Sequence, residues 1–73
     1  MKLKFPIHFQ ARISERDLNI DHVKNAIREP DFKKETFHGR MLVRKDFDGK
    51  TIEVIYSKHP KTEEYAIITA YYL

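Results

Sequence analysis

The Asp48-Gly49 pair, between two β-rich segments, is the feature that most constrains the fold of this chain. An Asp-Gly pair is typical of a two-residue β-hairpin turn, because glycine readily adopts the positive φ that such a turn requires. Residues 40–47 (RMLVRKDF) precede the turn and residues 51–57 (TIEVIYS) follow it. The second segment is rich in β-branched and aromatic residues, as strands are. The sequence therefore predicts an antiparallel hairpin in the middle of the chain.

A third strand is predicted over residues 65–73 (YAIITAYYL), the most apolar segment of the sequence. It completes a β-meander with the central hairpin. The near-continuous hydrophobicity of its sequence and of residues 51–57 indicates that these two strands lie centrally in the sheet, with both faces at least partly covered. Residues 31–38 form a weaker candidate strand, in which two phenylalanines lie among charged residues.

The first thirty residues are predicted to be mainly helical, unlike the β-rich remainder of the chain. A short strand is expected in residues 2–7, and two helices are expected within residues 8–29. Asn19 is a favourable N-cap for the second helix, which should end before Pro30 because the residue preceding proline avoids the helical region. The predicted fold class is α+β. A short N-terminal strand and two helices pack on one face of an antiparallel β-meander of three to four strands.

With 73 residues, the chain is expected to form a single domain, residues 1–73, since a second hydrophobic core could not be built. It contains no cysteine, which excludes disulfides and thiolate zinc sites, and its four histidines lack the spacing of a zinc site. No metal or cofactor is expected. No apolar segment approaches the roughly 18 residues of a membrane span. We therefore expect a cytoplasmic protein without a membrane partner.

Three polar residues recur every fourth position near the N-terminus: His8, Arg12 and Arg16. This spacing places them on one stripe of the first predicted helix. The stripe could be an ordinary solvated helix face. Alternatively it faces a sheet edge and forms a polar cleft, in which His8 transfers a proton and the arginines hold a phosphate in their planar forks.

Basic residues are concentrated in residues 32–50, which contain six lysines and arginines and three acidic residues. Such a surplus indicates a polyanionic ligand, and Arg40, Arg44 and Lys45 are its candidate contacts. The alternative is an edge strand charged to prevent aggregation. On the last strand, Thr69 and Tyr71 share a face and could contact a base or a phosphate, although terminal tyrosines more often pack against the core.

Together these residues resemble a small bacterial and archaeal domain of unknown function. The resemblance is carried by the H-x3-R-x3-R run, by Glu29-Pro30, by residues 54–56 (VIY) and by residues 67–71 (IITAY). The order of elements is also similar to RelE/ParE-type toxins. That similarity implies a ribonuclease in which Arg44 or Lys45 stabilises the phosphate and Tyr71 takes the C-terminal position. The chain has Tyr71-Tyr72 where those ribonucleases have a His-Tyr pair.

The leading hypothesis is a toxin-like, RNA-binding protein of RelE-like fold, with metal-independent RNA cleavage as its hypothetical activity. The expected partners are RNA, a cognate antitoxin protein and a second copy of the chain. The main alternative is a non-catalytic module that binds a protein or nucleic acid through the same fold. A structural subunit without a site is a third reading. The candidate catalytic residues are His8, Arg12, Arg16 and Tyr71, and the candidate nucleic-acid contacts are Arg40, Arg44, Lys45 and Thr69.

Overall fold

The computed structural model describes all 73 residues, and five strands form one sheet. From one edge to the other, the strands are β1 (Lys2–Lys4), β5 (Glu64–Tyr72), β4 (Lys50–Lys58), β3 (Met41–Phe47) and β2 (Phe32–Glu35). β1 pairs with β5 in parallel, and all other neighbours are antiparallel. The most hydrophobic strands of the sequence, β4 and β5, lie inside the sheet, as expected.

Two helices of nine residues connect β1 to β2: α1 (Ile7–Glu15) and α2 (Ile20–Arg28). The side chain of Asn19 caps α2 by accepting hydrogen bonds from the backbone N–H groups of Asp21 and His22. The helix ends at Glu29, the residue before Pro30. Neither helix is long and apolar enough to cross a membrane.

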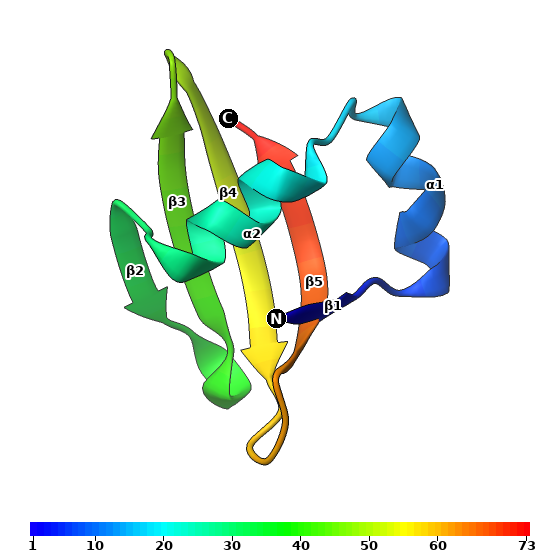
Figure 1. The fold of residues 1–73 in the computed structure, drawn as a ribbon, viewed down its shortest axis with the longest axis vertical. Helices are drawn as coiled ribbons and strands as arrows, with labels where there is room; N and C mark the ends of the chain where they lie inside the picture. The colour runs from blue at the N-terminus through cyan, green and yellow to red at the C-terminus, as the bar shows by residue number, and fades with distance from the viewer.

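The two helices occupy different places (Figure 1). α2 lies across one face of the sheet and contacts β3 and β4, whereas α1 lies beside the β5 edge. The expectation that both helices pack on one face of the sheet therefore holds for α2, whereas α1 lies at the edge. We call the opposite face of the sheet, which carries no helix, the open face.

The central hairpin confirms the turn expected from the sequence. Asp48 and Gly49 both have positive φ, 51° and 86°, as the two central residues of a type I′ turn require. The turn fixes the register of β3 against β4, so that Val43 lies opposite Val54. Because side chains alternate across a strand, this register also fixes which residues reach the open face.

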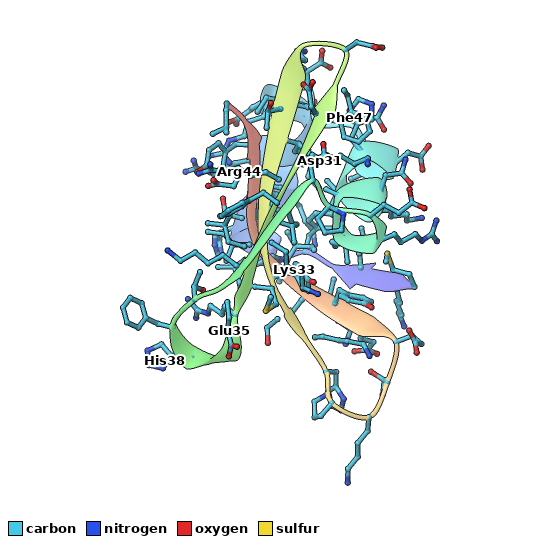
Figure 2. The ribbon with its side chains drawn as sticks, turned by 90° about the vertical axis from the view of Figure 1, so that its left-hand side faces the viewer. Asp31, Lys33, Glu35, His38, Arg44 and Phe47 are labelled. Carbon is cyan, nitrogen blue, oxygen red and sulfur yellow. The ribbon has the colours of Figure 1, made fainter.

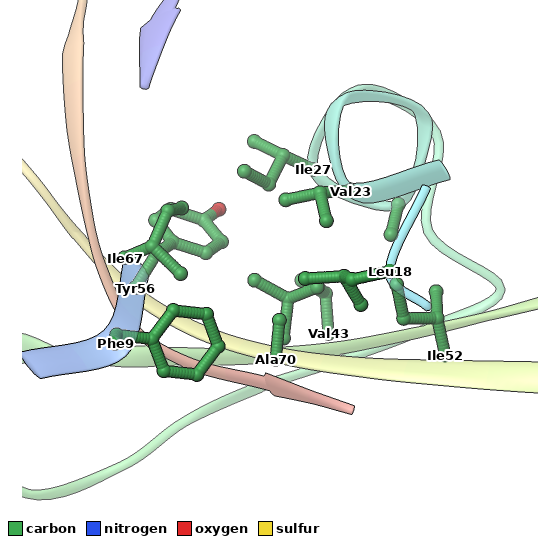
Figure 3. Close-up of a cluster of buried hydrophobic side chains, with 11 residues drawn as sticks. Phe9, Leu18, Val23, Ile27, Val43, Ile52, Tyr56, Ile67 and Ala70 are labelled. Atoms are coloured by element: carbon green, nitrogen blue, oxygen red, sulfur yellow. The ribbon is translucent and has the colours of Figure 1, made fainter. Parts of the chain in front are cut away.

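The hydrophobic core lies between α2 and the sheet (Figure 3). Val23, Ala26 and Ile27 of α2 pack against Val43, Ile52 and Val54 of β3 and β4. Phe9 is the buried residue of α1, and it joins the same cluster together with Ile67 and Ala70 of β5. Burial of each large apolar side chain contributes about 1.5–3 kcal/mol, so this single cluster accounts for most of the driving force for folding.

The α+β fold class is confirmed, with a short N-terminal strand and two helices ahead of a β-meander. The sheet has five strands rather than three or four, and it is mixed rather than purely antiparallel. The additional parallel pair exists because the two helices carry the chain from β1 across the sheet, so that β1 and β5 run in the same direction at the far edge.

Candidate nucleic-acid interface

Four residues lie directly opposite one another on the open face, one on each of four neighbouring strands. Phe32 of β2 is opposite Arg44 of β3, Arg44 is opposite Glu53 of β4, and Glu53 is opposite Tyr71 of β5. We call this set the cross-strand row. Directly opposite side chains in antiparallel strands lie close enough to interact, so the row forms a continuous line of contacts across the sheet.

Glu53 is the centre of the row. Its carboxylate accepts a hydrogen bond from Arg44 Nε, at 2.8 Å from Oε1, and another from the Tyr71 hydroxyl at Oε2. Glu53 is only 4% exposed although no helix covers it. The long side chains on the two neighbouring strands shield it instead. A buried carboxylate is costly unless it is paired and hydrogen-bonded, and here each oxygen has a donor.

The network shifts two acid–base equilibria. Burial raises the pKa of Glu53, but the hydrogen bonds from Tyr71 and Arg44 and the Arg44 charge outweigh burial, so this pKa lies below its ordinary value of 4.5. The hydrogen bond to Glu53, together with burial, raises the pKa of Tyr71 above its ordinary value of 10.0. At neutral pH, therefore, Glu53 is a carboxylate and Tyr71 is a protonated donor.

Arg44 is held in one orientation by this network. Its Nε donates to Glu53, and its guanidinium carbon lies 5.5 Å from the ring centroid of Phe32. Its side chain is nevertheless 45% exposed, and the terminal Nη groups form no hydrogen bond within the protein. Two parallel N–H groups of one guanidinium can bind two oxygens of a phosphate. Arg44 is thus an oriented, accessible anion-binding group.

Arg16 lies at the β5 end of the row, beside Tyr71. Its positive charge lowers the pKa of Tyr71 and so partly offsets the larger, raising effect of Glu53. Its Nη1 donates to the carbonyl oxygen of Ala70 at 3.1 Å, and the guanidinium lies 5.5 Å from the Phe9 ring. β1 pairs only with residues 64–66, so the upper part of β5 has no strand on its outer side. Arg16 satisfies one of the outward-facing carbonyl groups there, which is a structural role as well as a source of charge.

A second set lies next to the row on the open face: Lys34, Leu42, Ile55 and Thr69, again directly opposite one another. Arg40 precedes β3 in an extended conformation and continues the face of Leu42 and Arg44. The three ion pairs of the structure include neither Lys34 nor Arg40. The two sets, Arg40 and Arg16 together hold four basic side chains and one carboxylate, a surplus of positive charge.

The structure thus brings together most of the residues singled out from the sequence. The open face or its edge holds Arg16, Arg40, Arg44, Thr69 and Tyr71. Lys45 lies on the opposite face, where its Nζ donates to the carbonyl oxygen of Glu29 at 2.8 Å and lies 3.9 Å from Asp31. It connects the end of α2 to β3 and is separate from the cross-strand row.

His8 and Arg12 are also separate from the row. Both are exposed on α1, and neither side chain forms a hydrogen bond or an ion pair. The four-residue spacing correctly placed them on a helix. It could not show that only Arg16, at the C-terminal end of the helix, reaches the sheet.

Sequence reasoning missed Glu53, the residue that organises the site. A signal was present: Glu53 is the single acidic residue in the otherwise β-branched and aromatic segment of residues 51–57. A charge inside a central strand requires a partner. The partner residues, however, are 9 and 18 positions away in the sequence, and only the register of three strands identifies them.

Comparison with known families adds one result. A model of the domain of unknown function DUF4258 matches residues 6–72. The chain belongs to the DUF4258 family. The DUF4258 segment includes both helices, strands β2 to β5 and the whole cross-strand row, and excludes only β1 among the elements. This confirms the resemblance to a small domain of unknown function, whereas nothing links the chain to RelE/ParE-type toxins. Searches of curated proteins and of solved structures found no match.

Proposed function

We propose that the open face of the sheet binds single-stranded RNA, with Arg44 as its principal phosphate contact. The observation that carries this proposal is the orientation of Arg44. Glu53 accepts from Nε, the edge of the guanidinium nearest the protein, and the exposed Nη groups remain for a ligand. A guanidinium fixed in this way loses little conformational entropy when it binds a phosphate.

The surroundings of Arg44 suit a polynucleotide better than an isolated anion. Phe32 lies beside Arg44 on the edge strand and is 47% exposed, so one ring face is accessible to a base. Bases of single-stranded RNA stack on aromatic side chains, and an open sheet face is one surface on which they do so. The unpaired cations Lys34 and Arg40 lie along the same face and can neutralise further phosphates.

The geometry favours binding over cleavage. Cleavage by attack of the 2′-hydroxyl would need a proton acceptor near the phosphate. Glu53 is a poor acceptor, because both of its oxygens are engaged and its pKa is lowered. His8, the candidate from the sequence, is exposed on α1 and has no contact with the row. A toxin-like ribonuclease with a cognate antitoxin, as in RelE/ParE-type systems, would need this RNA binding and, in addition, a His8 side chain that reaches the bound RNA.

The test is a titration of a fluorescently labelled, single-stranded RNA of eight nucleotides, followed by fluorescence anisotropy at several salt concentrations. Arg44→Ala should weaken binding and reduce the slope of log K against log salt by about 0.7, the value for one phosphate on a single strand. Arg28→Ala is the matched control, because Arg28 is an exposed arginine on α2, on the other side of the sheet.

Arg44→Lys separates charge from geometry. It keeps the positive charge but loses the planar fork and the Nε donor to Glu53, so its affinity should lie between those of the wild type and Arg44→Ala. Equal affinities for the Arg44→Ala and Arg28→Ala variants, or no binding of the wild type at low salt, would refute the proposal. Binding of RNA that does not depend on salt would also refute a phosphate contact at Arg44, and the non-catalytic protein-interaction module would then remain as the alternative.

A further inference from the structure

The connection between β2 and β3 exposes an aromatic side chain that the core does not use. Phe37 is 85% exposed, and it is one of only two residues of the chain with an exposed phenyl ring, the other being Phe32. A phenyl ring that stays in water forgoes about 2 kcal/mol of stabilisation that its burial would contribute. Ile7 of α1 is equally exposed, so exposure alone does not distinguish Phe37; the residues around it do.

The turn that contains Phe37 is closed by hydrogen bonds between Thr36 and Arg40. Thr36 donates from its backbone N–H to the carbonyl oxygen of Arg40 at 2.7 Å, and its hydroxyl donates to the same oxygen at 3.2 Å. The N–H of Arg40 donates to the carbonyl oxygen of Phe37 at 3.4 Å. His38 and Gly39 both have positive φ, 62° and 70°. The turn is therefore a compact, hydrogen-bonded structure that fixes the position of the Phe37 backbone, from which the ring extends into solvent.

Two features beside Phe37 fit a nucleic-acid ligand. An open hollow of about 450 Å³ is lined by Lys34, Glu35, Thr36 and Phe37. Lys34 of this lining is exposed and unpaired, and so is Arg40, the residue that ends the turn. In the edge-on view of the sheet, His38 and Arg44 lie on the same side, away from α2 (Figure 2). The turn thus continues the open face beyond the end of the strands.

We infer that Phe37 is a second base-stacking subsite of an extended RNA path, with Lys34 and Arg40 contacting the phosphates between it and Arg44. This inference rests on the proposed function. The extended backbone from Arg44 back to Arg40, which precedes β3, covers about 13 Å at ~3.3 Å per residue. A stacked strand advances by about 3.4 Å per phosphate, so the path spans roughly four nucleotides.

The charges around Phe37 favour RNA over a protein partner. Phe37 is a single exposed ring near two unpaired cations, Lys34 and Arg40, and one carboxylate, Glu35, whereas protein-binding patches present contiguous apolar area of several hundred Å². Stacking on one ring flanked by cations is the arrangement found in single-strand binding, where each stacked base contributes about 5- to 150-fold in affinity. A protein partner on this surface is one of the outcomes that the experiment distinguishes.

The experiment uses two substitutions of Phe37 and two lengths of single-stranded RNA. Phe37→Leu keeps an apolar side chain of similar size but removes the π face. It should weaken binding of an eight-nucleotide RNA by about 5-fold or more. The affinity for a dinucleotide should stay the same, because a dinucleotide cannot span from Arg44 to Phe37. Ile7→Ala is the matched control, an equally exposed apolar residue on α1.

Phe37→Trp supplies a direct readout, because the chain contains no other tryptophan. It should keep or raise the affinity for the eight-nucleotide RNA, and its fluorescence should be quenched by that RNA and not by the dinucleotide.

Equal eight-nucleotide affinities of Phe37→Leu and the wild type, with Arg44→Ala still weaker, would overturn this subsite and leave the proposed function standing. Loss of self-association or of protein binding in Phe37→Leu, without a change in RNA affinity, would also overturn it. Absence of wild-type RNA binding would overturn both.

Discussion

The Tyr71 hydroxyl donates a hydrogen bond to the carboxylate of Glu53, which lies directly opposite on the neighbouring strand, although 18 positions separate the two residues in the sequence. Arg44 reaches the same carboxylate from the other side. The carboxylate thus connects three strands on a face without a helix. Burying it between two donors fixes the donors in turn, and this is how a structural network also orients a ligand-binding arginine.

Glu53→Gln should lower the free energy of unfolding at pH 7 by about 1–3 kcal/mol, because the charge-assisted hydrogen bonds from Arg44 and Tyr71 are weakened. The folded-state pKa of Glu53 lies below 4.5, so its stabilising effect is complete above about pH 4.5 and is lost as pH falls through that lower pKa. The wild type and the variant should therefore converge in urea denaturation at acidic pH. Glu63→Gln, at an exposed position, is the control and should match the wild type at every pH.

Tyr71→Phe removes one of the two donors to Glu53 and should cost about 1–2 kcal/mol at pH 7. Because the pKa of Tyr71 is raised above 10.0, its contribution is complete below pH 10 and is lost as pH rises through the raised value. The difference between the two proteins should shrink in strongly alkaline solution.

A double-mutant cycle with Glu53→Gln checks that the two residues act together. The coupling energy between them should be about 0.5–3 kcal/mol, as for residues in one hydrogen-bond network. Additive effects of the two substitutions would contradict a shared network.

Tyr72 tests the opposite face. Its hydroxyl accepts a hydrogen bond from the backbone N–H of Asn19 at 3.2 Å and lies 3.0 Å from Nδ1 of His22, whose ring stacks on Phe47 at 3.9 Å. Tyr72→Phe should lower stability by about 1 kcal/mol, or the melting temperature by about 4–8 °C. RNA affinity should not change, because Tyr72 faces α2. A loss of RNA binding at temperatures where the variant is folded would contradict the placement of the site on the open face.

His8 separates binding from catalysis. Its side chain is exposed and makes no hydrogen bond, so His8→Ala should leave both the melting temperature and the affinity for RNA unchanged. If the protein cleaves RNA with His8 as acid or base, the same substitution should reduce single-turnover cleavage by about 100-fold or more. Cleavage by the wild type that persists in His8→Ala would remove His8 from the mechanism, and a wild type without cleavage would leave binding as the activity.

Local signals were enough to predict much of the fold. Asn19 and Pro30 bounded α2, because capping and the restriction before proline act within a few residues. Asp48 and Gly49 placed the hairpin for the same reason, and β-branched and aromatic residues identified β4 and β5. The parallel pairing of β1 with β5 had no such signal, because it depends on how far the helices carry the chain.

For the site, the sequence by itself determined the types of residue and their local spacing: a basic stretch around Arg44, a helical stripe ending at Arg16 and a terminal strand with Tyr71. Only the tertiary structure decided which of them meet. Strand register placed Arg44 and Tyr71 on either side of Glu53 and turned Lys45 to the other face, since one step along a strand reverses the side on which a residue lies. Register is set by turns and by burial of the whole core, so no local pattern in the sequence contains it.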